Sequence, residues 1–220
     1  MIETAHVVGA GRVGSALSAR LTERGVRLTE SAGLVLICVP DRAIAEVAAS
    51  IQTGPWVAHV SGATPLAALA PHTRRFSLHP LQTFTKARGA EQFDGAFAAV
   101  TAETEEARAL GFELAELLGL QPFPLADERR DAYHAGAAFA SSYLVTLRRA
   151  AGLLLESAGA PPEALDPLMR RTIENDFQMT GPFVRGDWAT IAAHAAAVRR
   201  ERPELEPLAT ALADATKALL

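Results

Sequence analysis

The chain opens on a short apolar run that meets three glycines in a G-x-G-x-x-G spacing, at Gly9, Gly11 and Gly14. Helical periodicity continues after the last glycine, through residues 15–21. This order of strand, tight turn and helix restricts the start of the chain to an α/β unit. The three glycines then have mechanical reasons: a tight turn, a close approach of the backbone to a phosphate, and close packing of helix on strand. We expect a phosphate to lie on the unpaired N–H groups at the helix start, although an ordinary strand-to-helix turn is the alternative.

Length and composition are those of a globular protein with a real core. The 220 residues are enough for one large or two small domains, with 49% hydrophobic and 21% charged residues. The net charge of −4 gives no reason to expect nucleic acid as a partner. Arginine pairs such as Arg129-Arg130 are interpreted as solvated helix faces, because acidic residues surround most of them.

The sequence offers no sign of export or of membrane insertion. No basic segment followed by an apolar one opens the chain, and the apolar runs are too short to span a bilayer. We therefore expect a cytoplasmic protein without membrane contact. The single cysteine, Cys38, lies in an apolar run and is expected to be a buried strand residue rather than a reactive thiol.

Short apolar runs alternate with helical patterns in the first half of the chain, which predicts a mostly parallel α/β sheet. The expected strands are residues 6–8, 34–39, 56–59, 75–78, 96–101 and 121–124, and the expected helices are 12–23, 43–50, 65–69 and 103–118. The strands stop after Leu125, so we predict an α/β domain over 1–125 and an all-helical domain over 126–220. Three aspartates are expected to cap helices in the second part: Asp127, Asp166 and Asp187.

Residues 26–30 occupy the place where a dinucleotide fold has its second strand, and Glu30 is near the position of the ribose-binding acid. The next strong strand begins only a few residues later, at Leu34. Neighbouring parallel strands need a crossover of about a dozen residues, so we expect that these two segments cannot be successive parallel strands. A loop or edge segment is preferred over an antiparallel hairpin, and Glu30 is either a ribose ligand or a solvated acid.

Candidate ligand-binding residues follow the expected strands, because ligands bind beyond the carboxyl ends of parallel strands. Val39 and Pro40 end the strongest strand, although proline after a strand is also ordinary punctuation. Ser61 follows the next strand, where it either binds a carboxamide or substrate oxygen or caps the following helix. His79 ends a further strand and can exchange a proton near neutral pH; the alternative is a turn residue bonded to backbone.

Two further candidates lie in the helical part. His134 shares a helix face with Ser141, which suits either a cleft wall or a helix–helix contact. Arg185 lies in a glycine-containing segment and can hold a carboxylate or phosphate through two parallel hydrogen bonds. The alternative for Arg185 is a salt bridge to Asp187 or Asp176. One cysteine and scattered histidines give no metal site.

Together these motifs resemble a family of Rossmann-like predicted NADP-dependent oxidoreductases with a C-terminal helical domain of unknown function. The matching segments are residues 9–14, 34–41, 60–63, 78–84, 134, 139–143, 180–182 and 185–187. The resemblance covers essentially the whole chain. It implies membership of the larger group that includes prephenate dehydrogenase, pyrroline-carboxylate reductase and the β-hydroxyacid dehydrogenases.

The resemblance implies a nicotinamide dinucleotide on the first domain, a homodimer formed through the helical domain, and a small anionic substrate between the domains. NADP is the expected cofactor and NAD the alternative. The implied cofactor-binding residues are Gly9, Gly11, Arg12, Val13, Gly14, Val39, Pro40 and Ser61. His79 and His134 are the candidates for proton transfer, and Ser141 and Arg185 for substrate binding.

The expected activity is hydride transfer between the nicotinamide and a C=O or C=N carbon. The sequence departs from the family pattern at two places that bear on this expected activity. The second-strand region is shortened, and Ser142 stands where the family often has an asparagine. No lysine shares the helix face of His134, so the lysine-based chemistry of β-hydroxyacid dehydrogenases is not carried over. The alternative is a non-catalytic regulatory protein that binds a nucleotide or another phosphate ligand.

Overall fold

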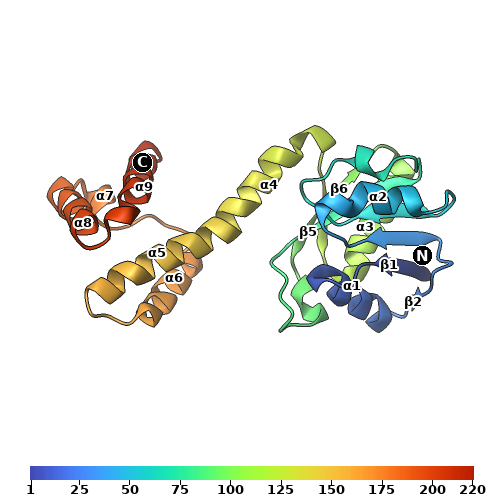
Figure 1. Ribbon diagram of the computed structural model, residues 1–220, viewed down its shortest axis with the longest axis horizontal. Helices are drawn as coiled ribbons and strands as arrows, with labels where there is room; N and C mark the ends of the chain where they lie inside the picture. Colours follow the sequence, from blue (N-terminus) through green and yellow to red (C-terminus); the bar gives the residue numbers. More distant parts are fainter. The chain divides into compact units, whose positions relative to one another are not determined.

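Seven strands join into one sheet in the order β2-β1-β3-β4-β5-β6-β7 in the computed structural model, which describes residues 1–220 (Figure 1). The strands are β1 (Thr4–Val8), β2 (Arg27–Leu28), β3 (Leu34–Ile37), β4 (Trp56–His59), β5 (Arg75–Leu81), β6 (Phe97–Ala102) and β7 (Gln121–Pro124). All neighbouring strands are parallel except β5 and β6. The prediction of a mostly parallel α/β sheet followed by helices is confirmed.

The antiparallel pair arises because no α-helix separates β5 from β6. Only a short 3₁₀ helix, η3 (Ala90–Phe93), lies between them. The chain therefore does not return to the starting edge of the sheet, as a parallel neighbour would require. The pairing of β5 with β6 runs from Phe76 to Leu81, whereas the pairing of β4 with β5 stops at Ser77.

The second-strand region forms an edge segment, as preferred from the sequence. β2 has two residues and pairs with Thr4 and Ala5, at the amino end of β1, on the side away from β3. Val35 of β3 pairs with His6 on the other side of β1. Because β2 ends at the level where β3 begins, five residues, 29–33, suffice to connect them. The expectation that these segments cannot be successive parallel strands is therefore wrong, because both are parallel to β1. The need for a long crossover applies to strands that are neighbours in the sheet, and here β1 lies between the two.

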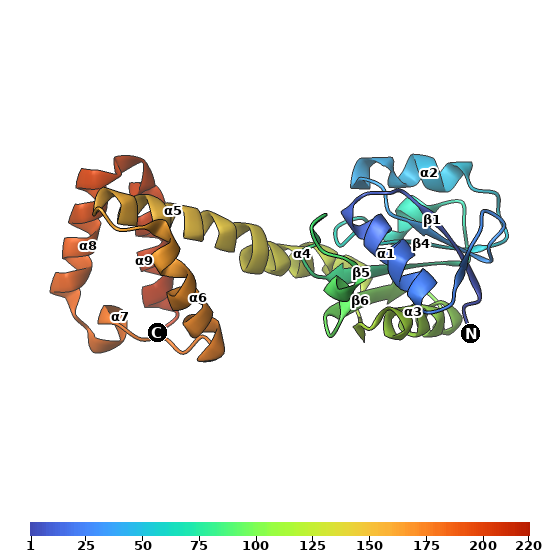
Figure 2. The same cartoon turned by 90° about the horizontal axis from the view of Figure 1, so that it is seen from below.

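Helices cover both faces of the sheet (Figure 2). Helices α1 (Arg12–Glu23) and α3 (Glu105–Leu118) pack on one face, whereas α2 (Ile44–Ser50) and the 3₁₀ helix η2 (Leu66–Leu69) pack on the other. Each face carries its own cluster of buried apolar side chains, and successive side chains of β3 alternate between them: Leu34 and Leu36 belong to the cluster under α1 and α3, and Val35 and Ile37 to the one under α2 and η2. Burial on both faces explains why β3 is apolar throughout.

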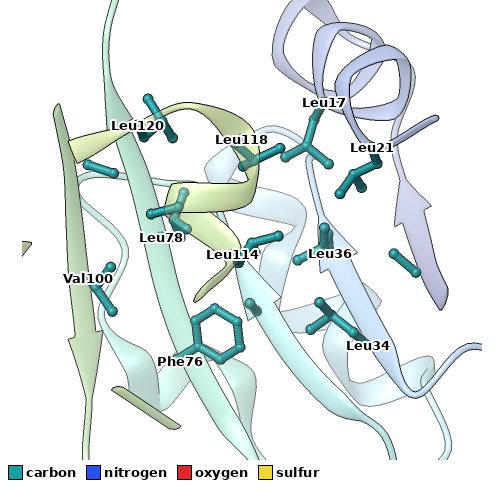
Figure 3. Packing of buried hydrophobic residues seen from close by; sticks show 14 of the residues in the cluster. Leu17, Leu21, Leu34, Leu36, Phe76, Leu78, Val100, Leu114, Leu118 and Leu120 are labelled. Atoms are coloured by element: carbon teal, nitrogen blue, oxygen red, sulfur yellow. The ribbon is translucent and has the colours of Figure 1, made fainter. Parts of the chain in front are cut away.

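The larger cluster contains most of the large, fully buried side chains of the first unit. Those labelled in Figure 3 come from α1, from the three strands β3, β5 and β6, from α3 and from the residue before β7: Leu17, Leu21, Leu34, Leu36, Phe76, Leu78, Val100, Leu114, Leu118 and Leu120. Each large apolar side chain buried in this way contributes roughly 1.5–3 kcal/mol relative to an exposed one. This cluster fixes the strands whose carboxyl ends carry the candidate site.

Two of the three predicted helix caps are wrong. Asp187 does cap α8 (Trp188–Glu201), where its carboxylate accepts the Thr190 N–H at 3.1 Å. Asp127 instead binds groups outside its own helix start, and Asp166 lies inside α6 (Leu165–Glu174), where it pairs with Arg148. Both carboxylates instead bind donors that are distant in the sequence: the Leu66 N–H for Asp127 and the Arg148 side chain for Asp166.

The structure divides into two compact units, Met1–Phe139 and Ala140–Leu220. The last strand ends at Pro124, next to the boundary expected at Leu125, but α4 (Arg130–Ala138) belongs to the first unit. A π-helical turn, Phe139–Tyr143, then leads without a break into α5 (Leu144–Ser157), so the predicted long helix is present and contains a π-helical turn at the division. Gly159, with φ of 74°, follows α5 as expected from the sequence.

The second unit is helical and poor in core. It contains α5, α6, α7 (Pro182–Arg185), α8 and α9 (Glu206–Ala218). Val198 is its only buried large apolar side chain. Others are largely exposed, such as Leu168, Ile173, Phe177 and Trp188. None of the helices has the length and apolar character needed to cross a membrane.

Candidate functional site

The glycine loop has the geometry that its spacing predicts. Gly9 has φ of 112°, and a Cβ atom there would lie 2.5 Å from the Cys38 carbonyl oxygen at the end of β3. A Cβ at Gly14 would lie 2.0 Å from the Gly9 carbonyl oxygen, which fixes the close approach of α1 to the loop. A Cβ at Gly11 would meet nothing within 4 Å. Gly9 thus makes the turn, Gly14 allows the packing, and Gly11 faces open space.

Open space at Gly11 coincides with the start of α1. Gly11 is the N-cap residue and provides no side-chain cap, and no acidic residue lies in the first turn. The first N–H groups of a helix have no partner within the helix, and the helix dipole favours an anion there. Val39 lies next to the glycine loop, since its Cγ1 would be 3.3 Å from a Cβ atom at Gly9. Pro40, which follows Val39, is exposed.

Cys38 directly follows β3 and is only partly buried, so the expectation of a buried strand residue is wrong in both respects. Burial raises the pKa of its thiol to about 12, so the reactive thiolate is absent at neutral pH.

The structure brings the two predicted histidines together. His79 lies near the end of β5 and His134 on α4, and their ring centroids are 6.2 Å apart. Gly62, which follows β4, lies between them, because a Cβ there would be 2.9 Å from a ring carbon of each. Both histidines therefore belong to one site on the first unit.

Tyr133 completes this group and was missed from the sequence. Its hydroxyl lies 2.7 Å from His79 Nδ1, and the two rings meet edge to face at 5.5 Å between centroids. The two residues are 54 positions apart in the chain, so no local spacing relates them. Only the packing of α4 against β5 reveals the pair.

A buried guanidinium, also missed, lies beneath the His79–Tyr133 pair. Arg130 is only 2% exposed, so the interpretation of the Arg129-Arg130 pair as a solvated face is wrong for this residue. It donates to the carboxylate of Asp127, to the Ser61 carbonyl oxygen at 3.3 Å, and to the Ser77 hydroxyl. Arg130 thereby ties the start of α4 to β5 and to the segment after β4.

Asp127 and Ser61 complete this buried network. The Asp127 carboxylate accepts the Leu66 N–H with both oxygens, each at 3.2 Å. The Ser61 hydroxyl oxygen accepts the N–H groups of Ala63 at 3.2 Å and Thr64 at 3.0 Å. Ser61 therefore closes the turn after β4, while its hydroxyl hydrogen remains a donor. The prediction that it caps the following helix is wrong, because η2 begins at Leu66 with Pro65 as its N-cap residue.

His59, at the end of β4, is fully buried beside this network. Its Nδ1 accepts the Ser61 N–H at 3.2 Å, and its Nε2 has no hydrogen-bond partner. Burial, reinforced by the Arg130 charge, lowers the pKa of His59 to about 3. The ring is therefore neutral over the physiological range.

Burial and charge also control the protonation of the His79–Tyr133 pair. Burial, then the neighbouring His134 and Arg130, lowers the pKa of His79 to about 4. Burial raises the pKa of Tyr133 to about 12, and Arg130 acts in the opposite direction. At neutral pH both groups are uncharged. One hydrogen fills the bond between them, which leaves a second N–H or O–H free to donate to a ligand.

Ser141 and Arg185, the two predicted substrate-binding residues, belong to the second unit. Ser141 lies in the π-helical turn and Arg185 ends α7. Arg185 is exposed and forms no salt bridge with Asp187 or Asp176, so the alternative given to it from the sequence is wrong. Asp187 is occupied in capping α8.

Comparison with known families identifies the chain. The model of a domain of unknown function, DUF2520, matches residues 96–216, which is more than half of the 220 residues. The chain belongs to the DUF2520 family. No curated protein sequence matches it.

Solved structures share the fold of this DUF2520 protein over its whole length. A candidate NADP oxidoreductase from Bacteroides fragilis is 21% identical, with a TM-score of 0.80 over 98% of both chains. A protein from Thermotoga maritima is 22% identical, with a TM-score of 0.74 over 97% of this chain and 99% of that one. A reductive aminase from Aspergillus terreus is 14% identical, with a TM-score of 0.64 over 99% and 95%. These likenesses confirm the Rossmann-like fold with a helical second part.

The glycine loop gives a first prediction. Gly14→Ala should destabilise the protein by about 1–3 kcal/mol, because the new methyl group collides with the Gly9 carbonyl. Gly11→Ala should cost less, at most about 1 kcal/mol, since its methyl group enters open space and only the N-cap preference for glycine over alanine is lost. Urea unfolding followed by circular dichroism measures both, and equal stabilities of the two variants would contradict the assignment.

The neutral histidines give a second prediction, on pH. The unfolded chain binds protons on His59 and His79 as the pH falls below about 6.5, whereas the folded protein holds both neutral down to about 4. Stability should therefore fall as the pH is lowered from 6.5 to 4.

His79→Gln should make this fall shallower, by up to about 1.4 kcal/mol per pH unit, discounted for the partial exposure of the ring. The measurement is the urea midpoint at each pH, with His194→Gln in the second unit as the control. An unchanged slope in His79→Gln would show that His79 is charged in the folded protein.

Proposed function

We propose that the protein is an NADP(H)-dependent oxidoreductase, with NAD(H) as the alternative cofactor. The observation that carries the proposal is the open space at Gly11, at the uncapped start of α1, on the same sheet whose β5 presents the His79–Tyr133 pair. A phosphate site and a neutral proton donor thus occur on one Rossmann-like unit. Structural relatives include an imine reductase from a Pseudomonas species and a prephenate dehydrogenase structure that contains NAD⁺, which support a nicotinamide cofactor.

The first unit would hold the cofactor. Its pyrophosphate would lie at Gly11 and the first turn of α1, with Val39 and Pro40 beside the loop and Ser61 donating its remaining hydroxyl hydrogen. The bound nicotinamide supplies or accepts a hydride, which passes to or from a C=O or C=N carbon.

The His79–Tyr133 pair would supply the proton that accompanies the hydride. When a carbonyl or imine is reduced, its oxygen or nitrogen takes a proton from the free N–H or O–H of the pair. If Tyr133 is left as the phenolate, the buried guanidinium of Arg130 stabilises the charge, in agreement with its lowering of the Tyr133 pKa. His134, next to His79 and exposed, would exchange the proton with solvent.

The substrate would be a small anionic metabolite. Arg185 and Ser141 are the residues we assign to it, because an unpaired guanidinium binds a carboxylate through two parallel hydrogen bonds. Both belong to the second unit, as does the surface assigned below to dimer formation.

The second candidate function is a non-catalytic regulatory protein that binds a nucleotide or another phosphate ligand. The observation that favours it is the shortness of β2, which ends at the amino end of β1. Glu30 follows in a turn with its side chain exposed, as a solvated acid does. This arrangement gives the adenosine ribose less to bind than a full second strand would.

Titration decides between the two candidates, and it is the third prediction. NADPH should bind and change its nicotinamide fluorescence, and Gly11→Val should weaken binding by at least about tenfold because the side chain fills the phosphate space. His79→Gln should leave binding unchanged. Binding of AMP or phosphate with no dinucleotide binding at millimolar concentration would favour the regulatory protein.

We also propose a homodimer formed through the second unit. An 81-residue helical unit with one buried large apolar side chain cannot stabilise itself by burial alone. A second copy of the chain that covers the exposed side chains of α6 and α8 would supply the missing burial.

The dimer gives the fourth prediction. Light scattering should give a mass of twice 23.3 kDa for the natural chain. Ile173→Lys on α6 should shift the mass toward that of the monomer on dilution, because it places a charge among apolar side chains. Leu28→Lys, on the exposed edge strand, is the control. A monomer at all micromolar concentrations would contradict the proposal.

A further inference from the structure

A hollow of about 380 Å³ lies beside the glycine loop, between α1 and the loop that precedes η3. From α1 and its start it is lined by Gly11, Arg12 and Ser15, and from the other side by Lys86 and Arg88. No acidic side chain lines it. Three cationic side chains from distant parts of the chain therefore meet next to the open space at Gly11.

The loop that carries Lys86 and Arg88 is held from behind by a buried side chain. Gln92 is only 3% exposed, and its Oε1 accepts the Thr85 N–H at 2.8 Å. Its Nε2 donates to the carbonyl oxygens of Arg88 and Gly89, both at 2.9 Å. The backbone of residues 85–89 is thus fixed, while the cationic side chains remain exposed.

Further contacts hold this loop close to α1. The rings of Phe84 and Phe93, on either side of it, pack at 4.9 Å between centroids. Arg20, on α1, donates to the Ala90 carbonyl oxygen at 2.6 Å and to the Asp94 carboxylate at 2.7 Å. The hollow is consequently a feature of the folded first unit rather than a chance position of surface side chains.

The charge of the hollow is largely uncompensated. Arg12 and Lys86 form no ion pair in the structure, and Arg88 is 3.5 Å from Glu91, a residue outside the lining. Like charges gathered in this way repel one another, and a bound anion removes the repulsion. The ammonium of Lys86 and the guanidinium of Arg12 are both strong donors to phosphate oxygens.

We propose that this hollow binds a phosphate group of the dinucleotide, with Lys86 and Arg12 as direct ligands and Arg88 as a weaker one. The inference rests on the proposed function and extends its site to residues that the glycine motif does not include. The group bound is either the pyrophosphate or the 2′-phosphate of NADP(H), which share the same chemistry. Either way, part of the affinity comes from the loop after β5, which offsets the shortness of β2.

Calorimetric titration of the full chain with NADPH, NADH and inorganic pyrophosphate at low salt tests the proposal. Lys86→Met should weaken binding by about tenfold, and Lys86→Met with Arg88→Met by more, because each removes a charge-assisted contact. Arg24→Met removes an equally exposed cation at the far end of α1 and should have no effect. All three substituted side chains are exposed, so the variants are expected to fold, and circular dichroism verifies this.

The outcomes separate the possible sources of the phosphate. Weaker binding of all three probes identifies the pyrophosphate, and weaker binding of NADPH alone identifies the 2′-phosphate; both support the proposal. Variants that bind every probe as tightly as Arg24→Met overturn it. If the natural chain binds neither dinucleotide, the proposed function fails, yet pyrophosphate binding that depends on Lys86 still supports the hollow as a phosphate site. Absence of all binding overturns both.

Discussion

The candidate site depends on one ion pair, between the buried guanidinium of Arg130 and the partly exposed carboxylate of Asp127. The guanidinium also donates to the Ser61 carbonyl and the Ser77 hydroxyl, and the carboxylate accepts the Leu66 N–H. One pair thus joins the start of α4 to β5 and to the segment after β4. Removing Asp127 would leave the buried Arg130 charge without its carboxylate partner, and the cost is below the roughly 3–5 kcal/mol of a fully buried pair because solvent reaches the carboxylate. The arrangement of Tyr133 and His134 against His79 follows from it.

The same charge also sets the protonation of its neighbours. Arg130 lowers the pKa of His59 and of His79, in addition to the effect of burial, and it opposes the rise in the pKa of Tyr133. A fixed buried cation therefore keeps the imidazoles neutral and makes a tyrosinate less costly. This combination suits a site that gives up a proton to a reduced oxygen or nitrogen near neutral pH.

Local features of the site could be predicted from the sequence, and long-range ones could not. The roles of Gly9 and Gly14 follow from a turn and a helix that are adjacent in the chain, and they agree with the structure. His79 was found because it follows a strand. Arg130 and Tyr133 were not found, because their partners lie 53 to 69 positions away and their own helix pattern looks solvated. Similarly, the sequence does not place Lys86 near Arg12, because the two meet only when the loop after β5 folds back against α1.

The reversal of β6 has a consequence for His79. Beyond Ser77 the strand β4 no longer accompanies β5, so a purely parallel sheet would leave His79 in a loop. The antiparallel partner continues to Leu81, and the backbone on either side of His79 remains in a hydrogen-bonded ladder. The conformational entropy of this residue is lost when the chain folds and not when a ligand arrives. A histidine on a strand thus meets its substrate with its backbone already ordered, unlike one on a loop.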